Sequence, residues 1–443
     1  MDTAKAGWAE IETTPPLGLP MGGRGPRFAP GTLVLDPLVA QALVLEDTSG
    51  RQTLWISVDM IGMTFNATYA IRHEVSTVTG IPVESVIVNF SHTHSGPMSG
   101  FEGYATERPK PSELQAYEND VATKITRIAC RALDNLQPAT VTLHTGQSNL
   151  GINRRNRNEA GEMGMAPNPD GVYNPDLWVL DVTAQSGRCV VFNYGCHPVI
   201  VYGFSWDGIS ADYPGVCRNR LRETLGADVH CQFIQGCAGN VRPRLLADLA
   251  AGRFRKSTPK DPIAAGTDLA EDITRTLATP GTPLALNIAA ASGYFQAPKD
   301  QARIPGPEHW QTLAESEDEL NQNLGQYWAN RLRAGIPPAR AVPWAIGLLR
   351  LAPACTIAWM AGEVLAEWMG HLRSWLNDGT LVVWGYCQDG RGYLPTDELI
   401  PEGGYEVDRS NTYNRMGPGP FAPGLNEAAR KGFLALRTQL DAP

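Results

Sequence analysis

Short apolar runs alternate with helix-like segments along the whole chain. Runs rich in β-branched and aromatic residues predict strands at 53–63, 83–90, 139–145, 188–196, 230–236, 355–360 and 381–387. Several of these runs are apolar without alternation, as in strands that are covered on both faces. The pattern predicts an α/β fold, with a mixed β-sheet core, as one sheet or as two packed sheets, flanked by helices.

Apolar side chains spaced three and four residues apart predict helices between these strands. The clearest helix begins at Ser112, where Gln115 would complete a capping box, and ends before Pro138. Further helices are predicted at 212–226, at 362–379, and at 308–335 as one helix or a pair. Glu363 would open the segment 362–379, where the helix dipole favours a carboxylate.

Two long stretches, 146–177 and 388–424, are rich in Gly, Asn and Pro and carry few regular signals. Loops of this length in a compact protein usually serve a function or lack structure, and the tyrosines and arginines here favour function. No linker-like boundary divides the chain. We therefore expect one catalytic domain over residues 1–443 with long active-site loops.

Composition narrows the class of protein. The net charge of −9 argues against a nucleic-acid partner. No apolar stretch approaches the ~20 residues of a transmembrane helix. The N-terminal segment lacks the apolar region of a secretory signal, and the eight cysteines form no CxxC pair. We expect a cytoplasmic protein with a small-molecule substrate; its oligomeric state is open, and a homo-oligomer is one possibility.

Histidines follow two of the predicted strands. SHTHSGP, with His92 and His94, comes after VIVNF, and His197 comes after RCVVFNYGC. Residues i and i+2 of an extended segment point to the same side, so both imidazoles of the first motif would enter one cleft. Catalytic zinc sites commonly use three protein ligands and keep one position open. The spacing fits a metal site, and it equally fits ordinary polar residues at a strand end.

At these residues the sequence resembles the N-terminal catalytic domain of the neutral/alkaline non-lysosomal ceramidase family. The resemblance extends from AGWAEIETTPPLGLPMGG to PEGGYEV, and its motifs are SVDMIG, SHTHSGP, INRR, NYGCHPV, SADYPG, QGCAGNV, AGE and YLPTDELIPEGGYEV. That family has a zinc amidase site. The resemblance implies that His92, His197 and Glu363 bind one zinc ion per chain and that Tyr393 approaches the same metal.

The resemblance also implies catalytic residues beside the metal. His94 would lie off the metal and act on the substrate, while Arg154 and Tyr405 would hold the oxygen of the scissile carbonyl. Preorganised donors of this kind stabilise an oxyanion. Zinc between two neutral imidazoles and a carboxylate keeps a net positive charge, which lowers the pKa of a bound water towards ~7.

Two positions depart from the family pattern. In QGCAGNVRPR, Asn240 stands where the ceramidases have an aspartate, and Arg242 stands where they have a serine with a catalytic role. We expect no counterpart of the carboxy-terminal sandwich domain of the family. We assign Asn240 and Arg242 to substrate binding. Arginine prefers planar bidentate partners such as carboxylates, so Arg242 predicts an anionic substrate; pairing with a protein carboxylate is the alternative.

The sequence thus predicts a zinc-dependent amidohydrolase that cleaves a C–N bond of a small anionic amide, lactam or imide by metal-activated water. An esterase, lactonase or phosphoester hydrolase on the same site is the first alternative, because zinc hydroxide attacks many acyl and phosphoryl centres. A binding protein that has lost catalysis is the second.

Overall fold

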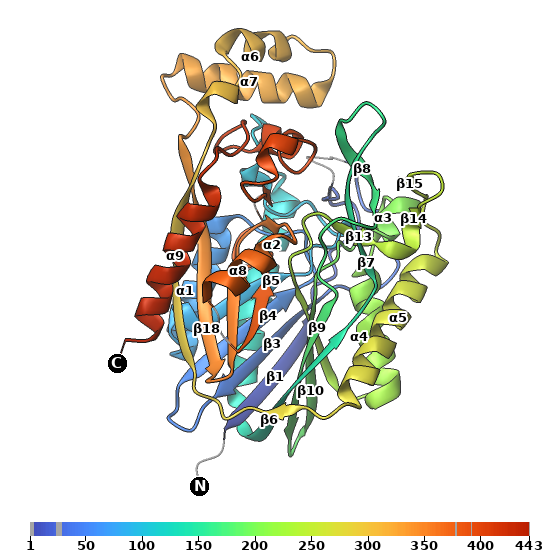
Figure 1. Cartoon of the computed structure of the whole chain (residues 1–443), viewed down its shortest axis with the longest axis vertical. Coiled ribbons are helices and arrows are strands. Elements are labelled where there is room, and N and C mark those ends of the chain that lie inside the picture. Colours follow the sequence, from blue (N-terminus) through green and yellow to red (C-terminus); the bar gives the residue numbers. More distant parts are fainter. Residues whose placement is uncertain (1–3, 24–28, 377–378, 391, 443) are drawn as a thin grey trace.

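Two β-sheets packed face to face form the core of the molecule, and helices cover their outer faces (Figure 1). The computed structural model describes residues 4–442 except 24–28, 377–378 and 391. The interface between the sheets is apolar and aromatic: the rings of Trp55 in one sheet and Trp384 in the other lie 5.0 Å apart. Two packed sheets with helices outside confirm the predicted α/β fold.

Both sheets are mixed. The larger sheet has the strand order β12 (His230–Gln235), β10 (Gly187–Tyr194), β9 (Asp176–Ala184), β6 (Gln137–Gln147), β1 (Lys5–Glu12), β3 (Val39–Glu46), β4 (Gln52–Val58) and β5 (Val86–Phe90), with β16 (Thr282–Pro283) paired to β6. The smaller sheet has the order β17 (Ala289–Pro298), β18 (Ala341–Ala352), β19 (Cys355–Met360) and β21 (Thr380–Trp384). Parallel pairs are β4 with β5, β10 with β12, and β19 with β21.

The helices pack their apolar faces onto the sheets. Their bounds are α1 (Phe65–Thr79), α2 (Ser112–Asp134), α3 (Val201–Phe204), α4 (Asp212–Leu225), α5 (Lys260–Leu277), α6 (Pro307–Ala314), α7 (Glu319–Arg333), α8 (Trp368–Leu376) and α9 (Leu425–Leu440). Helices α1 and α2 cover one half of the larger sheet, and α4 and α5 cover the other half. Helix α9 packs on β17 and β18.

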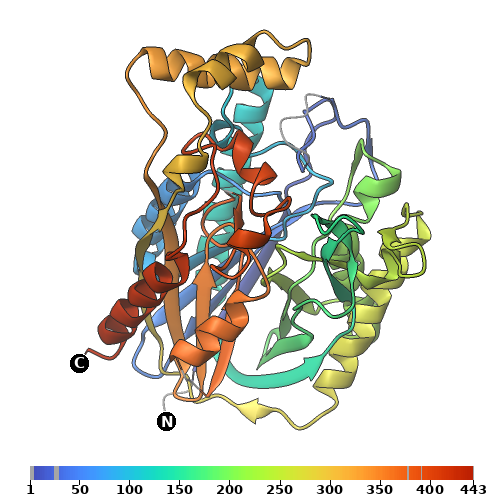
Figure 2. The same cartoon turned by 45° about the horizontal axis from the view of Figure 1, so that its top comes forward.

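Helices α6 and α7 form a hairpin set apart from the sheets (Figures 1 and 2), held by an aromatic cluster of Trp310, Tyr327 and Trp328. In the part of the chain that the structure describes, no helix combines the length and the apolar character that crossing a bilayer requires.

The carboxyl ends of the parallel strand pairs meet at one place. The backbone N–H of Phe90 donates to the carbonyl of Tyr386 at 3.1 Å, which joins the end of β5 to the segment after β21. The side-chain amide of Asn89 donates to the carbonyl of Gln235 at 3.3 Å, which joins β5 to the end of β12. Ligands of α/β proteins bind just outside the carboxyl ends of such strands. The fold therefore places the polar segments after these strands around one site.

Most predicted elements are present. Each predicted strand overlaps a strand of the structure, α4 matches the prediction at 212–226, and the segment 308–335 is a pair of helices. The capping box at Ser112 is absent: the N-cap residue is Pro111, no side chain caps the helix, and the amide of Gln115 donates to Asn119 instead.

The prediction for 362–379 was wrong at its start. The helix α8 begins only at Trp368, and Glu363 lies in the short strand β20 (Glu363–Val364), which pairs with β22 (Tyr393–Leu394). A strand pairing between distant segments therefore overrides the local helical pattern at this position. The carboxylate of Glu363 accordingly gains nothing from a helix N-terminus.

The stretch 146–177 is more regular than predicted, since it contains a β-hairpin of β7 (Gly151–Arg157) and β8 (Met163–Asn168). The remaining short strands are β2 (Leu33–Val34), β11 (Gly208–Ile209), β13 (Val241–Pro243), β14 (Ala247–Asp248) and β15 (Arg253–Phe254). Strand β13 pairs with β7, so the INRR segment lies against the segment that follows β12.

Candidate metal centre

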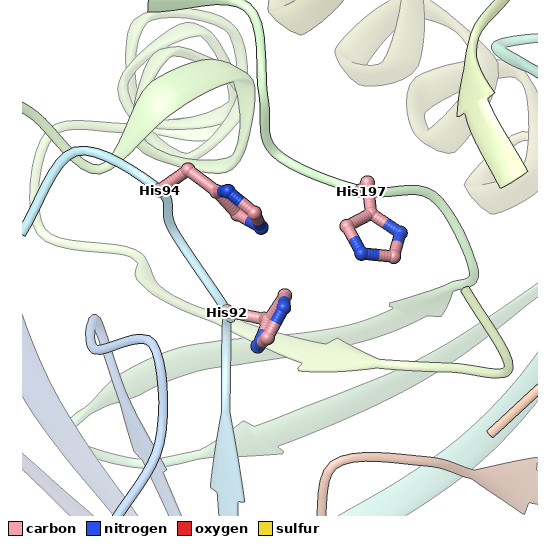
Figure 3. A group of neighbouring side chains, drawn as sticks. All are labelled: His92, His94 and His197. Atoms are coloured by element: carbon pink, nitrogen blue, oxygen red, sulfur yellow. The ribbon is translucent and has the colours of Figure 1, made fainter. Parts of the chain in front are cut away.

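Three histidines gather outside the strand ends. His92 and His94 follow β5, and His197 follows β10. Each offers a ring nitrogen within 4.8 Å of the others, so the group could hold a metal ion. Figure 3 shows the three rings turned towards a common space. The side chains of His92 and His197 are buried, and that of His94 is partly exposed.

Backbone carbonyls orient two of the imidazoles. Nδ1 of His92 lies 2.7 Å from the carbonyl oxygen of Ile61, and Nδ1 of His197 lies 2.6 Å from that of Ala238. A carbonyl oxygen only accepts, so each Nδ1 carries a proton, and the Nε2 of a neutral imidazole held in this way presents a lone pair. His92 holds its position with a left-handed φ of 64°, a conformation that is uncommon outside glycine. Conformations of this kind cluster at functional sites.

Glu363 faces both lone pairs. Its Oε2 lies 3.2 Å from Nε2 of His92 and 3.1 Å from Nε2 of His197. Burial, followed by the positive charge of Arg154, lowers the pKa of His197 to about 4, so this imidazole is neutral at neutral pH. The three atoms are therefore acceptors that face one another.

This convergence of acceptors fits a cation. The buried Nε2 atoms of His92 and of His94 have no hydrogen-bond partner among the residues that the structure describes. Tetrahedral zinc with bonds of about 2.0–2.1 Å separates its ligand atoms by roughly 3.3 Å. The distances of 3.1 and 3.2 Å from Glu363 to the imidazoles are close to that value. Two imidazoles and a carboxylate are also a ligand set that zinc commonly uses.

Tyr393 lies directly beside Glu363. The two residues are register partners in the parallel pair of β20 and β22. The ring of Tyr393 is stacked on that of His197 with 6.2 Å between centroids. Burial raises the pKa of the Tyr393 phenol well above its usual range, although Arg154 acts in the opposite direction. The structure thus brings together the residues predicted as metal ligands, with Tyr393 as a protonated phenol.

Arg154 supports this phenol from the hairpin β7–β8. Its Nη2 donates to the hydroxyl of Tyr393 at 2.9 Å, and its Nε donates to Glu406 at 2.8 Å. Arg155 donates to the other carboxylate oxygen of Glu406 at 3.0 Å. The guanidinium of Arg154 also lies 5.9 Å from the ring of Tyr405, a side chain that is 39% exposed. Arg154 and Tyr405 are therefore neighbours, and both contact Tyr393.

The ring of His94 lies 5.0 Å from that of His92 and 5.6 Å from that of His197. Burial, and then the neighbouring rings of His92 and His197, lower the pKa of His94 well below its usual value, so the imidazole is neutral. The backbone of Gly23 passes directly over the ring: a Cβ at Gly23 would lie 2.7 Å from Nδ1 of His94. With a φ of 94°, this position is suited to glycine for conformational reasons as well.

The two residues predicted to bind substrate differ in their surroundings. The carboxamide of Asn240 is used within the protein: its Nδ2 donates to both carboxylate oxygens of Glu367, and its Oδ1 accepts from the N–H of Ala366. The guanidinium of Arg242 lies 4.7 Å from the ring of Phe254. Substrate contacts of Asn240 and Arg242 stay predictions.

Sequence reasoning missed two residues of this site, Tyr386 and Glu406. The ring of Tyr386 lies 4.6 Å from that of His92, and its buried hydroxyl has no hydrogen-bond partner within the described ranges. The signal for Tyr386 was its position after an apolar run, as for His92 and His197. Glu406 gave no local signal, since its partners Arg154 and Arg155 are about 250 positions away in the sequence.

Comparisons with known proteins address the fold. No protein-family model and no curated protein matches the sequence. The solved structure of neutral ceramidase from Pseudomonas aeruginosa matches with a TM-score of 0.75 at 18% identity, covering 100% of this chain and 76% of that chain. A ceramidase complexed with C2 matches with a TM-score of 0.73 at 16% identity, covering 99% of this chain and 76% of that one. The chain therefore has a neutral-ceramidase-like fold, as the resemblance of its motifs predicted.

Proposed function

We propose that this protein is a zinc-dependent hydrolase that cleaves a C–N bond in a small anionic amide, lactam or imide. One observation carries the proposal: the lone pairs of His92 and His197 and the carboxylate of Glu363 face one another at 3.1–3.2 Å within a buried site. Their arrangement supports a divalent cation. The ceramidase-like fold supports hydrolysis of an amide, because a ceramidase cleaves one.

His92, His197 and Glu363 would hold the zinc ion, with Tyr393 as a weak additional ligand. When bound, zinc polarises the scissile carbonyl and lowers the pKa of a water molecule towards ~7. The residues around it bind and orient the substrate. Arg154 keeps the phenol of Tyr393 in place through its hydrogen bond of 2.9 Å.

His94 is the proposed proton carrier. As a neutral imidazole beside the other histidines, it can accept a proton from the attacking water and deliver it to the leaving nitrogen. The water oxygen then forms the new bond to the carbonyl carbon, and the C–N bond breaks to leave a carboxylic acid and an amine. Tyr405 and Arg154 would hold the carbonyl oxygen during this step, because preorganised donors stabilise an oxyanion.

The proposed anionic substrate depends chiefly on Arg242. Arg154 and Arg155 already share the carboxylate of Glu406, which offsets part of their charge. Arg242 lies on β13, next to the segment that carries Arg154 and Arg155, with its guanidinium over Phe254. An arginine on this strand can pair with a substrate carboxylate in a bidentate manner. A cytoplasmic location stays a prediction.

We expect purified protein to contain one zinc ion per chain and to hydrolyse at least one anionic C–N substrate. The test combines metal analysis with a hydrolysis screen over N-acyl amino acids, lactams, cyclic imides, matched esters and long-chain ceramides. Chelation should abolish turnover, and added zinc should restore it. Ester hydrolysis without amide hydrolysis would favour the esterase alternative. Protein with well under one zinc ion per chain and no turnover would contradict the proposal and favour a binding protein.

Arg242→Ser is expected to raise KM for an anionic substrate about 10- to 100-fold, because a hydrogen bond to a charged group contributes about 1.5–3 kcal/mol. KM for the neutral amide of the same compound should change little, and Arg242→Lys should lie between. Arg220→Ser is the control, since Arg220 pairs with Glu223 on the exposed surface of α4. Equal changes in KM for both substrates would rule out the anionic pocket.

A further inference from the structure

The side chain of Gln235 bridges the two strand ends that carry His92 and His197. Its Nε2 donates to the carbonyl of Ser91 at 3.1 Å and to the carbonyl of Cys196 at 3.0 Å. Ser91 and Cys196 are the residues immediately before the two histidines. Its Oε1 accepts from the N–H of Cys196 at 3.4 Å. Gln235 is fully buried, so water does not compete for these hydrogen bonds.

Among the described residues, β5 shares no backbone ladder with β10 or β12, and the segments beyond them share a hydrogen bond from the N–H of His94 to the carbonyl of Pro198 at 3.2 Å. His92 follows β5 at one end of the strand order, and His197 follows β10 near the other end. The ends of β5 and β12 are joined by a side-chain amide: Asn89 accepts from the N–H of Gln235 at 2.8 Å and donates to its carbonyl at 3.3 Å. The separation of the two histidines therefore depends in part on side-chain amide hydrogen bonds, and Gln235 makes those to the residues immediately before them.

A carboxamide suits this position. The amide N–H₂ group offers two donors for two carbonyls, and the amide oxygen accepts at the same time. A glutamate would lack the donors, and a methionine would lack every polar atom. A metal site needs its ligand atoms placed to within about 0.2 Å, and groups that orient the ligands typically change metal affinity 10- to 100-fold when mutated.

We propose that Gln235 is a positioning residue that sets the spacing of His92 and His197, and through it the zinc affinity of the site. The inference rests on the proposed function, in which these histidines bind zinc. Gln235 itself touches neither imidazole among the hydrogen bonds of the described residues. It acts on the backbone from which both side chains extend.

The test compares Gln235→Met with Gln232→Met. Gln232 lies on the same strand, is equally buried, and donates from Nε2 to the carbonyl of Trp55 at 3.2 Å. Both variants lose a buried amide, so both should unfold at a lower temperature than the wild type. Zinc affinity, measured by competition with a chromogenic chelator, should fall about 10- to 100-fold in Gln235→Met and stay within about twofold of wild type in Gln232→Met.

Equal zinc affinities in the two variants would overturn the inference while leaving the zinc site intact. A wild-type protein that binds no zinc would instead overturn the proposed function and the inference with it, so the two failures are distinguishable. Gln235→Glu serves as a second variant that keeps the side-chain shape and should also weaken zinc binding. Unchanged affinity in Gln235→Glu would count against the inference even if Gln235→Met does not fold.

Discussion

His197→Ala is expected to lose bound zinc and to lower kcat/KM by at least about a thousandfold, because a catalytic metal contributes several kcal/mol to transition-state stabilisation. The imidazole of His197 is fully buried, with Nδ1 held by the carbonyl of Ala238 and Nε2 facing Glu363. Its removal deletes one of the three proposed protein ligands. Metal analysis and steady-state kinetics of the folded variant check the prediction.

Two further histidine variants serve as controls. His144→Ala removes another buried imidazole with an Nδ1 contact to a carbonyl, that of Thr279, so it should retain zinc and activity. His94→Ala should retain zinc but lose activity, since His94 is proposed to move protons. Loss of zinc in His94→Ala would instead assign His94 to the metal, a set that the spacing of His92, His94 and His197 also permits. A His197→Ala protein with full zinc content would refute the metal site.

Glu406→Gln is expected to lower the free energy of unfolding by about 3–5 kcal/mol, because it leaves the buried guanidinium of Arg154 without its carboxylate partner, while Arg155 keeps its ion pair with Glu402. The carboxylate of Glu406 accepts from Arg154 and Arg155, and all three side chains are almost fully buried. Loss of the ion pair between Glu406 and Arg154 should also weaken the hydrogen bond from Arg154 to Tyr393 and reduce activity. Denaturant unfolding at pH 7 measures the stability, and the exposed Glu223→Gln, which should change it by less than about 1 kcal/mol, is the control.

The ion pairs of Glu406 with Arg154 and Arg155 also predict that the stability of the protein depends on pH. Burial alone would raise the pKa of Glu406, but the charges of Arg154 and Arg155 hold it below the ordinary value. A carboxyl group whose pKa is lower in the folded state stabilises the fold above its unfolded pKa of about 4.3. That stabilisation is lost as the pH falls through the folded pKa. The difference between wild type and Glu406→Gln should therefore shrink below about pH 4, and a constant difference would contradict the assignment.

Local patterns predicted the elements that carry the histidines. The apolar runs before His92 and His197 are buried strands, and both side chains leave those strands at their carboxyl ends. The helix at 212–226 was also predictable, because its apolar spacing and its glycine stop lie within a few turns of each other. These features depend on neighbouring residues in the sequence, and the same elements are present in the folded structure.

Long-range contacts decided the rest of the site. Glu363 was predicted at the start of a helix, yet its backbone pairs with Tyr393, thirty positions further along the chain. Glu406 reaches Arg154 and Arg155 across about 250 positions, and no local pattern marks such a pair. Tyr386 and Gln235 likewise acquire their roles from the segments packed against them.

The sequence by itself determined the α/β class, the strands that end in histidines and the types of side chain available for the proposed metal site. Only the tertiary structure decided that Glu363 approaches the histidines from a short strand and that Glu406 offsets part of the charge of the arginines. It also decided that Gln235 forms hydrogen bonds to both strand ends that precede the histidines. The physical reason is that apolar periodicity records which face of an element is buried. Hydrogen bonds and ion pairs inside the site depend on which distant elements the folded core brings side by side.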